Sequence, residues 1–201
     1  MREKILEAAI EQFSKYGVRS VTMDDIARHL GISKKTLYQE FSDKKELVKI
    51  AFDQILKHDQ NNIEALMNGS DDQVIETLVH LSRMMRERLQ SINPITIMEV
   101  QKYFPDAWQI FVHHKEEVIL SQMMEILERG KKLGYFRKEI EVPILARIRV
   151  DQITSAMDST NFQDANYDIV KIQLEMMDHF LHGIFTEKGR EAYKTQQEHT
   201  N

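Results

Sequence analysis

Residues that stop helices are rare in this chain, which has only 3 Pro and 7 Gly among its 201 residues. Apolar residues recur every three or four positions along nearly every segment, and the alternation typical of strands is nearly absent. Spacing of this kind places apolar side chains on one face of an α-helix. The sequence therefore predicts an all-α protein whose helices pack through their apolar faces.

Composition excludes several classes of protein. The chain is long enough for a full hydrophobic core, and its 42% apolar and 29% charged residues are typical of a soluble globular protein. Without Cys it can form no disulfide, thiolate metal site or thiol nucleophile. The N-terminus is charged and amphipathic, unlike a signal peptide, and no apolar run reaches the roughly 18 residues of a membrane span. We therefore expect a cytoplasmic protein with no membrane partner.

Charge is distributed unevenly along the chain. Residues 1–50 carry 10 Lys and Arg against 8 Asp and Glu, whereas residues 51–201 carry 17 against 24. The net charge of the whole chain is −5. A mildly basic N-terminal part on an acidic remainder suits local contact with nucleic acid, because phosphate attracts the first part and repels the second.

Glycines and capping residues divide the N-terminal part into short helices. The first helix is expected over Arg2–Tyr16, and Gly17 ends it. Thr22 is a suitable N-cap for a second helix, Gly31 ends that helix, and Ser33 opens a third. Two short helices joined by a glycine turn are the arrangement of a helix-turn-helix.

A long helix follows the helix-turn-helix. Ser42 or Asp43 caps its start, and Glu46 lies at the capping-box position relative to Asp43. The helix is expected over Lys44–Met67, a length of about 36 Å at 1.5 Å per residue. A helix of this length spans a small domain, so we expect it to join the N-terminal part to the rest of the chain.

Further breaks divide the remainder of the chain. Gly69 marks one break, and Asp71 or Asp72 starts the next helix. Pro94 and Pro105 mark two more boundaries. The last two helices are expected over Ile144–Thr160 and Tyr167–Thr186.

The third helix has a polar face that suits DNA. In a helix-turn-helix the second helix of the motif enters the major groove, and its first side chains contact base edges and phosphates. Lys34 and Lys35 occupy those first positions. Gln39, near the same face, can bond adenine through its side-chain amide. We therefore predict double-stranded DNA as a partner.

The same stretch resembles the TetR/AcrR family of transcriptional regulators. The resemblance covers residues 2–52 and rests on Thr22, Asp25-Ile26-Ala27, Gly31-Ile32-Ser33, Thr36-Leu37-Tyr38-x-x-Phe41 and Lys44-x-x-Leu47. It implies a three-helix helix-turn-helix DNA-binding domain over residues 1–50. It also implies a helical-bundle domain over residues 51–201 that binds a small-molecule effector and forms a homodimer. Such a protein is expected to be a repressor that the effector releases from DNA.

The resemblance also implies contacts with phosphate. It gives this role to Tyr38, because an exposed helical position does not favour a tyrosine unless its ring packs and its hydroxyl has a partner. It gives the same role to Lys44, which begins a helix whose N-terminus already attracts an anion. Thr22 can contact phosphate as well, although N-capping by itself would explain that residue. Thr36 can contact a base or a phosphate, or it can bond the backbone of its own helix.

Large, adaptable side chains gather in the middle helices. Ligand pockets in helical bundles are mostly apolar, and Met, of which the chain has 11, suits pliable sites. Packed core is the alternative explanation for the same pattern. The residues expected to contact an unidentified small apolar or amphipathic effector are Met85, Met98, Tyr103, Phe104, Trp108, Phe111 and Met123.

The last helix is apolar over more than one face, which requires partners on two sides. One partner is expected to be its own domain, and the other a symmetry-related copy of the chain. Burial wholly within one chain is the alternative. The residues expected at the homodimer interface are Ile148, Gln152, Met177, Phe180, Leu181 and Ile184.

Candidates for an enzyme or metal site are few. His113 and His114 are adjacent on a helix, so their side chains diverge by about 100°. His179 and His182 could hold a divalent ion, but a solvated or packed pair explains them better. No nucleophile motif is visible, so we expect no enzyme activity, cofactor or metal. A helix-turn-helix protein controlled by a protein partner, without a small-molecule pocket, is the other functional alternative.

Overall fold

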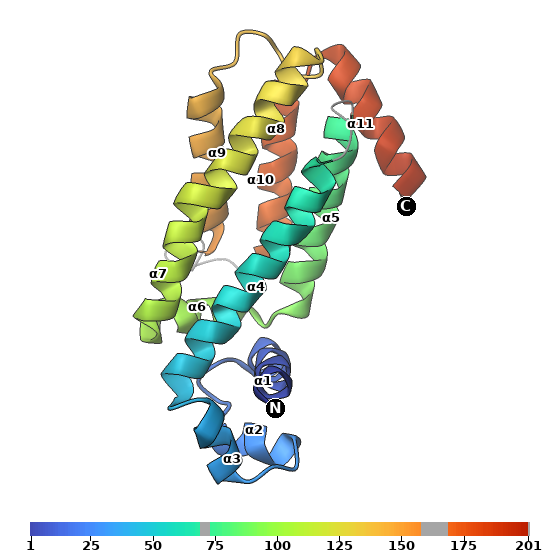
Figure 1. Ribbon diagram of the computed structural model, residues 1–201. Helices are drawn as coiled ribbons and strands as arrows, with labels where there is room; N and C mark the ends of the chain where they lie inside the picture. The colour runs from blue at the N-terminus through green and yellow to red at the C-terminus, as the bar shows by residue number, and fades with distance from the viewer. Residues whose placement is uncertain (69–72, 158–168, 201) are drawn as a thin grey trace. The chain divides into compact units, whose positions relative to one another are not determined.

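The computed structural model describes residues 1–68, 73–157 and 169–200. Within these residues the secondary structure is helical, with one isolated β-bridge between Phe136 and Phe185 and no strand (Figure 1). The prediction of an all-α protein is therefore confirmed for the described part of the chain. Five residues at expected helix boundaries lie outside the described residues: Gly69, Asp71, Asp72, Thr160 and Tyr167.

The chain forms two compact units. Unit 1 comprises Met1–Asp59 and Leu89–His114, and unit 2 comprises Gln60–Arg88 and Lys115–Asn201. The helices of unit 1 are α1 (Arg2–Tyr16), α2 (Met23–His29), α3 (Lys34–Glu40), the start of α4 (Lys44–Met67), α6 (Pro94–Tyr103) and α7 (Pro105–His114). The helices of unit 2 are the end of α4, most of α5 (Val74–Ser91), the π-helical segment η2 (Lys115–Ile119), α8 (Leu120–Lys132), α9 (Val142–Met157), α10 (Ile169–Ile184) and α11 (Glu187–Thr200).

This division differs from the boundary expected near residue 50. Residues 89–114 were expected to belong to the C-terminal domain, but they are compact with the first 59 residues. The helix bounds agree more closely, since α1 and α4 occupy the expected ranges Arg2–Tyr16 and Lys44–Met67. The functional division at residue 50 stays a prediction.

Unit 1 is built around one hydrophobic core. α1 contributes a stripe of buried side chains at helical spacing, and α2, α3, α4 and α6 each add apolar side chains to it. The core includes Ile5, Phe13, Ile26, Leu37, Leu47 and Val100. These side chains come from segments up to about 95 residues apart in the sequence, so packing rather than local propensity holds the short helices together.

Unit 2 has a second hydrophobic core. α8 packs against α9, and α9 packs against α10 (Figure 1). Phe136 and Leu181 lie in this core with almost no exposed surface. The rings of Phe185 and Tyr193, 5.2 Å apart between centroids, attach α11 to the end of α10.

Gly17 makes the turn after α1 and lies against α6. Its φ is 85°, a left-handed value that favours glycine, and its N–H donates to the Phe13 carbonyl at 3.0 Å. A Cβ atom there would lie 3.0 Å from the Glu99 carboxylate and 3.2 Å from Ile95. Gly31 also has a positive φ, 64°, but a Cβ there would meet no atom within 4 Å.

These surroundings predict different effects for two matched substitutions. Gly31→Ala should destabilise the protein by about 1 kcal/mol, since it adds only backbone strain. Gly17→Ala should cost about 1 kcal/mol more, because the methyl group also pushes against α6. Urea unfolding of both variants measures the difference. Equal losses would show that the contact with α6 does not constrain this turn.

Candidate nucleic-acid interface

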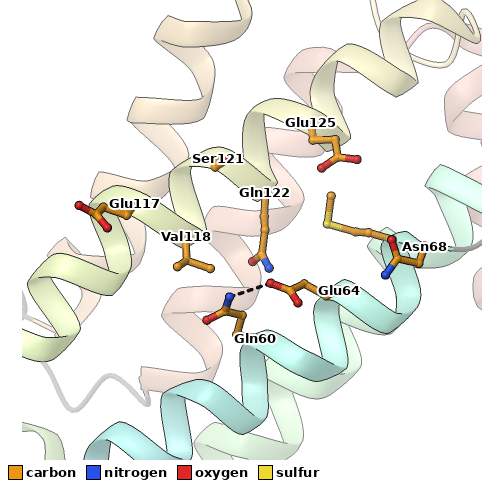
Figure 2. A pocket seen from close by; sticks show the side chains of 9 residues that line it. Gln60, Glu64, Asn68, Glu117, Val118, Ser121, Gln122 and Glu125 are labelled. Atoms are coloured by element: carbon orange, nitrogen blue, oxygen red, sulfur yellow. Dashed lines mark hydrogen bonds between the residues drawn. The ribbon is translucent and has the colours of Figure 1, made fainter.

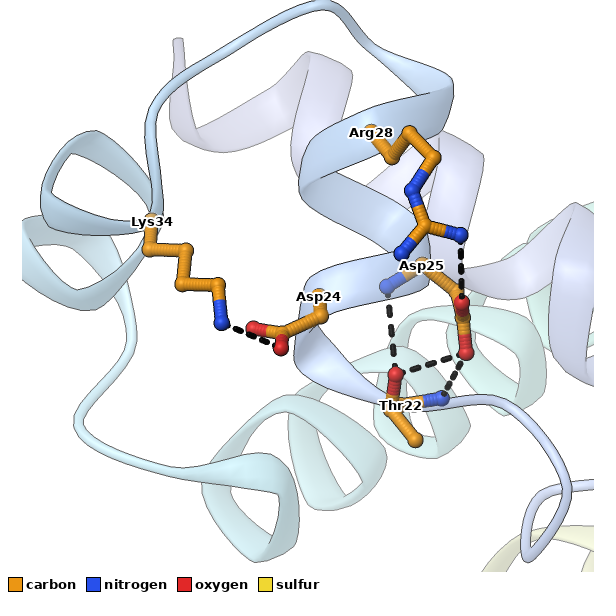
Figure 3. A network of polar contacts seen from close by, with 5 residues as sticks. All are labelled: Thr22, Asp24, Asp25, Arg28 and Lys34. Carbon is orange, nitrogen blue, oxygen red and sulfur yellow. Dashed lines mark hydrogen bonds and ion pairs between the residues drawn. The ribbon is translucent and has the colours of Figure 1, made fainter.

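Thr22 caps α2. Its hydroxyl accepts a hydrogen bond from the Asp25 N–H at 3.2 Å, and the Asp25 carboxylate accepts from the Thr22 hydroxyl at 2.6 Å and from its N–H at 3.0 Å (Figure 3). This capping box satisfies backbone groups at the helix start. The bonds from Thr22 also hold the pKa of the Asp25 carboxyl below its usual range. The structure thus shows the capping role of Thr22, and its phosphate contact stays a prediction.

Two buried side chains hold α3 in place. Leu37 has no exposed surface, and Phe41, directly after the helix, is 1% exposed. The Ser33 hydroxyl caps the helix by accepting from the Thr36 N–H at 3.1 Å, and the two side-chain hydroxyls lie 2.8 Å apart. Thr36 is half-buried and bonded to its own cap. The Thr36 hydroxyl thus contacts the Ser33 side chain, and its contact with a base or a phosphate stays a prediction.

The outer face of α3 is polar and exposed. Lys34, Lys35, Tyr38 and Gln39 are all exposed, whereas Leu37 between them is buried. Tyr38 keeps 50% of its surface exposed although it is aromatic. The structure therefore brings four of the predicted DNA-contacting residues onto one accessible surface.

Lys34 forms an ion pair that the sequence analysis missed. Its ammonium contacts the Asp24 carboxylate of α2, and both side chains are largely exposed (Figure 3). The ten-residue separation gives no helical spacing signal, so the pair depends on how α2 and α3 pack. An exposed pair contributes at most about 1 kcal/mol, so a phosphate could displace Asp24 from Lys34.

Lys44 lies at the start of α4. Its ammonium donates to the Arg19 carbonyl at 3.2 Å, and partial burial lowers its pKa below the usual lysine value. The start of α4 is capped as expected, with the Asp43 carboxylate accepting from the Glu46 N–H at 2.9 Å. The Glu46 carboxylate accepts from the Ser42 N–H at 2.7 Å, not from Asp43. Ser42 and Asp43 therefore share the capping role.

α6 is bonded directly to the turn after α1. The Glu99 carboxylate accepts from the Arg19 N–H at 2.8 Å, and the Arg19 guanidinium lies 4.4 Å from the Tyr103 ring centroid. The Thr96 hydroxyl donates to the Phe13 carbonyl at 2.9 Å. Arg19 and Glu99 are 80 residues apart, so sequence spacing could not have indicated this contact.

Comparison with known proteins agrees with this geometry. Residues 5–50 match the model of the bacterial regulatory proteins of the tetR family. The biofilm operon icaADBC HTH-type negative transcriptional regulator IcaR of Staphylococcus aureus is 30% identical over 132 residues, which cover 53% of this chain and 71% of IcaR. The chain belongs to the TetR family.

Two further comparisons extend this result. The HTH-type transcriptional regulator YvdT of Bacillus subtilis is 32% identical over 92 residues, and the match covers 45% of this chain and 47% of YvdT. A crystal structure described as a transcriptional regulator from Saccharomonospora viridis in complex with choline has a TM-score of 0.70 and 20% identity. It covers 92% of this chain and 98% of that chain, so the TetR-family fold extends over both units.

The residues expected to bind an effector are divided between the two units of this TetR-family protein, and their role stays a prediction. Met98 and Tyr103 are exposed on α6, and Phe104 and Trp108 pack against the core of unit 1. Phe111 is buried beside Trp108, with ring centroids 4.9 Å apart. The other two expected residues, Met85 and Met123, border the core of unit 2. Helical spacing identified apolar faces correctly but could not assign them to one unit.

Unit 2 contains an open cavity of about 250 Å³ between the end of α4 and the η2–α8 segment (Figure 2). Its lining is polar and acidic, and the Gln60 amide donates to the Glu64 carboxylate at 2.7 Å. None of the seven expected effector residues lines it. The lining residues are Gln60, Glu64, Met67, Asn68, Glu117, Val118, Ser121, Gln122 and Glu125.

The expected dimer residues divide into two groups. Ile148 of α9 is 44% exposed, as a contact with a second copy requires, and the neighbouring Ile144 is 59% exposed. Gln152 is half-buried. The four expected residues of α10 are 1% to 7% exposed within unit 2 itself, so they have little surface left for a partner: Met177, Phe180, Leu181 and Ile184. The wide apolar arc of α10 is therefore explained by its own core, which corrects this part of the expectation.

Unit 2 also contains a buried charge that the sequence analysis missed. Arg149 of α9 is 2% exposed and lies between Ala146 and Val150, which have no exposed surface. The signal was present in the sequence, because Arg149 shares a helical face with Ala146 and Ile153. An arginine on an apolar stripe indicates either burial of a charge or an unusual partner.

The described part of the chain contains no group of three or more His, Asp or Glu side chains that could hold a metal ion. His182 contacts Asp178, with 3.3 Å between Nδ1 and the carboxylate, and both side chains are exposed. No described helix is long and apolar enough to cross a membrane.

The Lys34–Asp24 pair predicts an effect on DNA binding. Asp24→Asn should tighten binding roughly threefold to tenfold at 0.1 M salt, because it releases Lys34 and removes a negative charge near phosphate. The free energy of unfolding should change by less than about 1 kcal/mol. Fluorescence anisotropy with labelled duplex DNA measures the affinity. Asp53→Asn, which removes the same charge from an ion pair on α4, is the matched control; equal effects of both variants would contradict the prediction.

Proposed function

We propose that this TetR-family protein is a transcriptional repressor that binds double-stranded DNA through unit 1 as a homodimer. A small-molecule effector bound in unit 2 releases it. The exposed polar face of α3 is the observation that carries the proposal, since buried Leu37 and Phe41 present Lys35, Tyr38 and Gln39 to solvent on a fixed helix. IcaR, itself a negative transcriptional regulator, supports the direction of control.

Sequence readout is assigned to residues near the two ends of α3. Lys34 and Lys35 lie in its first turn and reach base edges or phosphates from the major groove. Gln39 can pair its amide with adenine. These contacts specify the operator, whereas contacts to phosphate fix the orientation of the unit on the duplex.

Phosphate contacts are assigned to Tyr38 and Lys44. The Tyr38 hydroxyl can donate to a phosphate oxygen from the exposed face of α3. Lys44 adds a cation at the N-terminus of α4, where the helix dipole also favours an anion. Its ammonium now donates to the Arg19 carbonyl, a neutral acceptor, so a phosphate would be the stronger partner.

Control by the effector is assigned to helices that cross the boundary between the units. α4 begins in unit 1 and ends in unit 2, and α5 ends with three residues that belong to unit 1. α5 leads into α6, which is bonded to Arg19 through Glu99, and Arg19 in turn accepts from Lys44. An effector that binds one arrangement of these helices more tightly shifts the population away from the arrangement that fits DNA.

The assignment of effector binding to unit 2 has two supports. A protein of the same fold was crystallised with choline, so this architecture can hold a small molecule. Unit 2 has an open cavity of about 250 Å³. The homodimer is assigned to the exposed side of α9, where Ile144 and Ile148 are one helical turn apart.

DNA selection from genomic fragments followed by binding measurements tests the proposal. Tyr38→Phe should weaken operator binding roughly fivefold and leave the salt dependence unchanged, because it removes one neutral hydrogen-bond donor. Lys44→Ala should weaken binding and lower the salt slope by about one, because one phosphate contact is lost.

Lys57→Ala is the matched control for Lys44→Ala. Lys57 lies on α4 about 20 Å along the helix from Lys44 and is exposed. Lys57→Ala should leave the operator affinity and the salt slope nearly unchanged. If Lys44→Ala behaved like Lys57→Ala, the phosphate contact would be wrongly assigned.

The dimer assignment predicts a change of assembly state. Ile148→Glu should convert the protein from dimer to monomer at micromolar concentration in sedimentation equilibrium, because it places a charge in an apolar interface. Met98→Glu is the control, since Met98 is similarly exposed, at 42%, but lies on α6 in unit 1. A dimer that survives Ile148→Glu would rule out this face of α9.

A further inference from the structure

Arg149 is a buried cation whose guanidinium has almost no protein partner. It is 2% exposed, in the interior of unit 2. Among the described residues, its Nε and Nη1 atoms have no hydrogen-bond partner. Nη2 contacts only the thioether sulfur of Met85 at 3.9 Å, and a thioether is a weak acceptor. Five N–H donors are therefore held in an apolar core with one weak acceptor.

This burial has an electrostatic cost. Removal from water lowers the pKa of the Arg149 guanidinium to about 10, so the group is still a cation at neutral pH. Buried charges in proteins are normally paired with an opposite charge, because an isolated charge is poorly solvated in the interior. Within the described part of the chain, Arg149 therefore lacks the partner that its position requires.

Two other cations on or beside α9 do have partners. Arg147, two residues earlier on α9, contacts the Glu116 carboxylate. Lys115 lies 3.2 Å from Glu116 and 3.8 Å from Asp151. The carboxylates of Glu116 on η2 and Asp151 on α9 thus pair with Arg147 and Lys115, which leaves Arg149 as the buried exception.

Two side-chain amides of unit 2, one on α9 and one on α10, also have buried oxygens. The Gln173 side chain is 1% exposed, and its amide donates to the Ile153 carbonyl, one turn after Arg149, at 2.9 Å. The side-chain oxygens of Gln173 and Gln152 have no donor among the described residues. A native protein has few such groups, and each indicates a missing partner. The α9–α10 seam therefore offers a cation and two neutral acceptors inside an apolar core.

We propose that unit 2 binds an organic carboxylate, whose head group accepts hydrogen bonds from Arg149 and whose apolar body contacts the surrounding core. This inference rests on the proposed function, in that it gives the effector of unit 2 a chemical class. The planar guanidinium matches a carboxylate in a two-point hydrogen bond. Met85 is flexible and can move aside to admit the ligand.

Charge favours a carboxylate over other anions. One buried guanidinium neutralises one negative charge, whereas a phosphate monoester carries nearly two and would leave charge unpaired in the core. The open cavity of Figure 2 does not suit the head group, because Glu64, Glu117 and Glu125 line it and would repel an anion. A hydroxyl or N–H on the ligand body could donate to the Gln152 and Gln173 oxygens.

Thermal unfolding of the purified full chain tests the proposal with defined probes. Sodium octanoate, decanoate and dodecanoate are compared with decan-1-ol and decylamine, which have the same apolar body with a neutral or cationic head. At saturation, at least one carboxylate should raise the unfolding temperature by roughly 5 °C or more. Decan-1-ol and decylamine should not. An equal shift with either of them, or no shift with any carboxylate, would overturn the proposal.

Variants of two arginines on α9 separate binding at Arg149 from general charge effects. Arg149→Met should unfold at the same or a higher temperature than the unmodified protein without ligand, since it removes an unpaired buried charge, and it should lose the carboxylate shift. Arg147→Met should keep that shift. If Arg149→Met fails to fold, Arg149→Lys should retain a weaker shift, because it keeps the charge but not the planar fork. A full shift in Arg149→Met or Arg149→Lys would contradict the assignment.

The same protein without ligand is tested for DNA binding in parallel. DNA binding without any carboxylate shift would overturn the carboxylate inference and leave the DNA-binding part of the proposed function intact. A carboxylate shift that depends on Arg149, without DNA binding, would support the carboxylate inference and overturn the DNA-binding part of the proposed function.

Discussion

The DNA-binding surface depends on the burial of Leu37 and Phe41. α3 has seven residues, and a helix of that length is not stable in water by itself. The Leu37 side chain of α3 and the Phe41 side chain directly after the helix enter the core of unit 1. Ser33 caps the start of the helix. The positions of Lys35, Tyr38 and Gln39 therefore follow from apolar packing on the opposite side of the same helix.

The same core ties the helix-turn-helix to α6. Gly17 turns the chain with a φ of 85° close to Ile95 and Glu99, and Arg19 is held by Glu99 and Tyr103. The compact unit that contains the helix-turn-helix thus includes residues far beyond the motif. A change in α6 reaches Arg19, and through its carbonyl Lys44, without passing through α3. This gives the proposed phosphate contact at Lys44 a direct connection to α6, which follows α5.

Unit 2 combines two polar environments of opposite character. The open cavity is lined by carboxylates and amides, whereas the interior of the α9–α10 seam contains the guanidinium of Arg149. The first would attract cations and the second requires an anion. Electrostatics therefore separates the two as ligand sites, although they lie in the same small unit.

The sequence by itself determined the helices, their caps and the polar face of α3, because these depend on residues three or four positions apart. Thr22, Ser33, Gly17 and the apolar spacing within each helix carried that information. The tertiary structure decided which helix faces, far apart in the sequence, pack against each other. It assigned Trp108 and Phe111 to unit 1, filled the apolar arc of α10 within its own core, and paired Lys34 with Asp24. It also buried Arg149, since burial depends on which helices surround a residue, and local spacing does not contain that information.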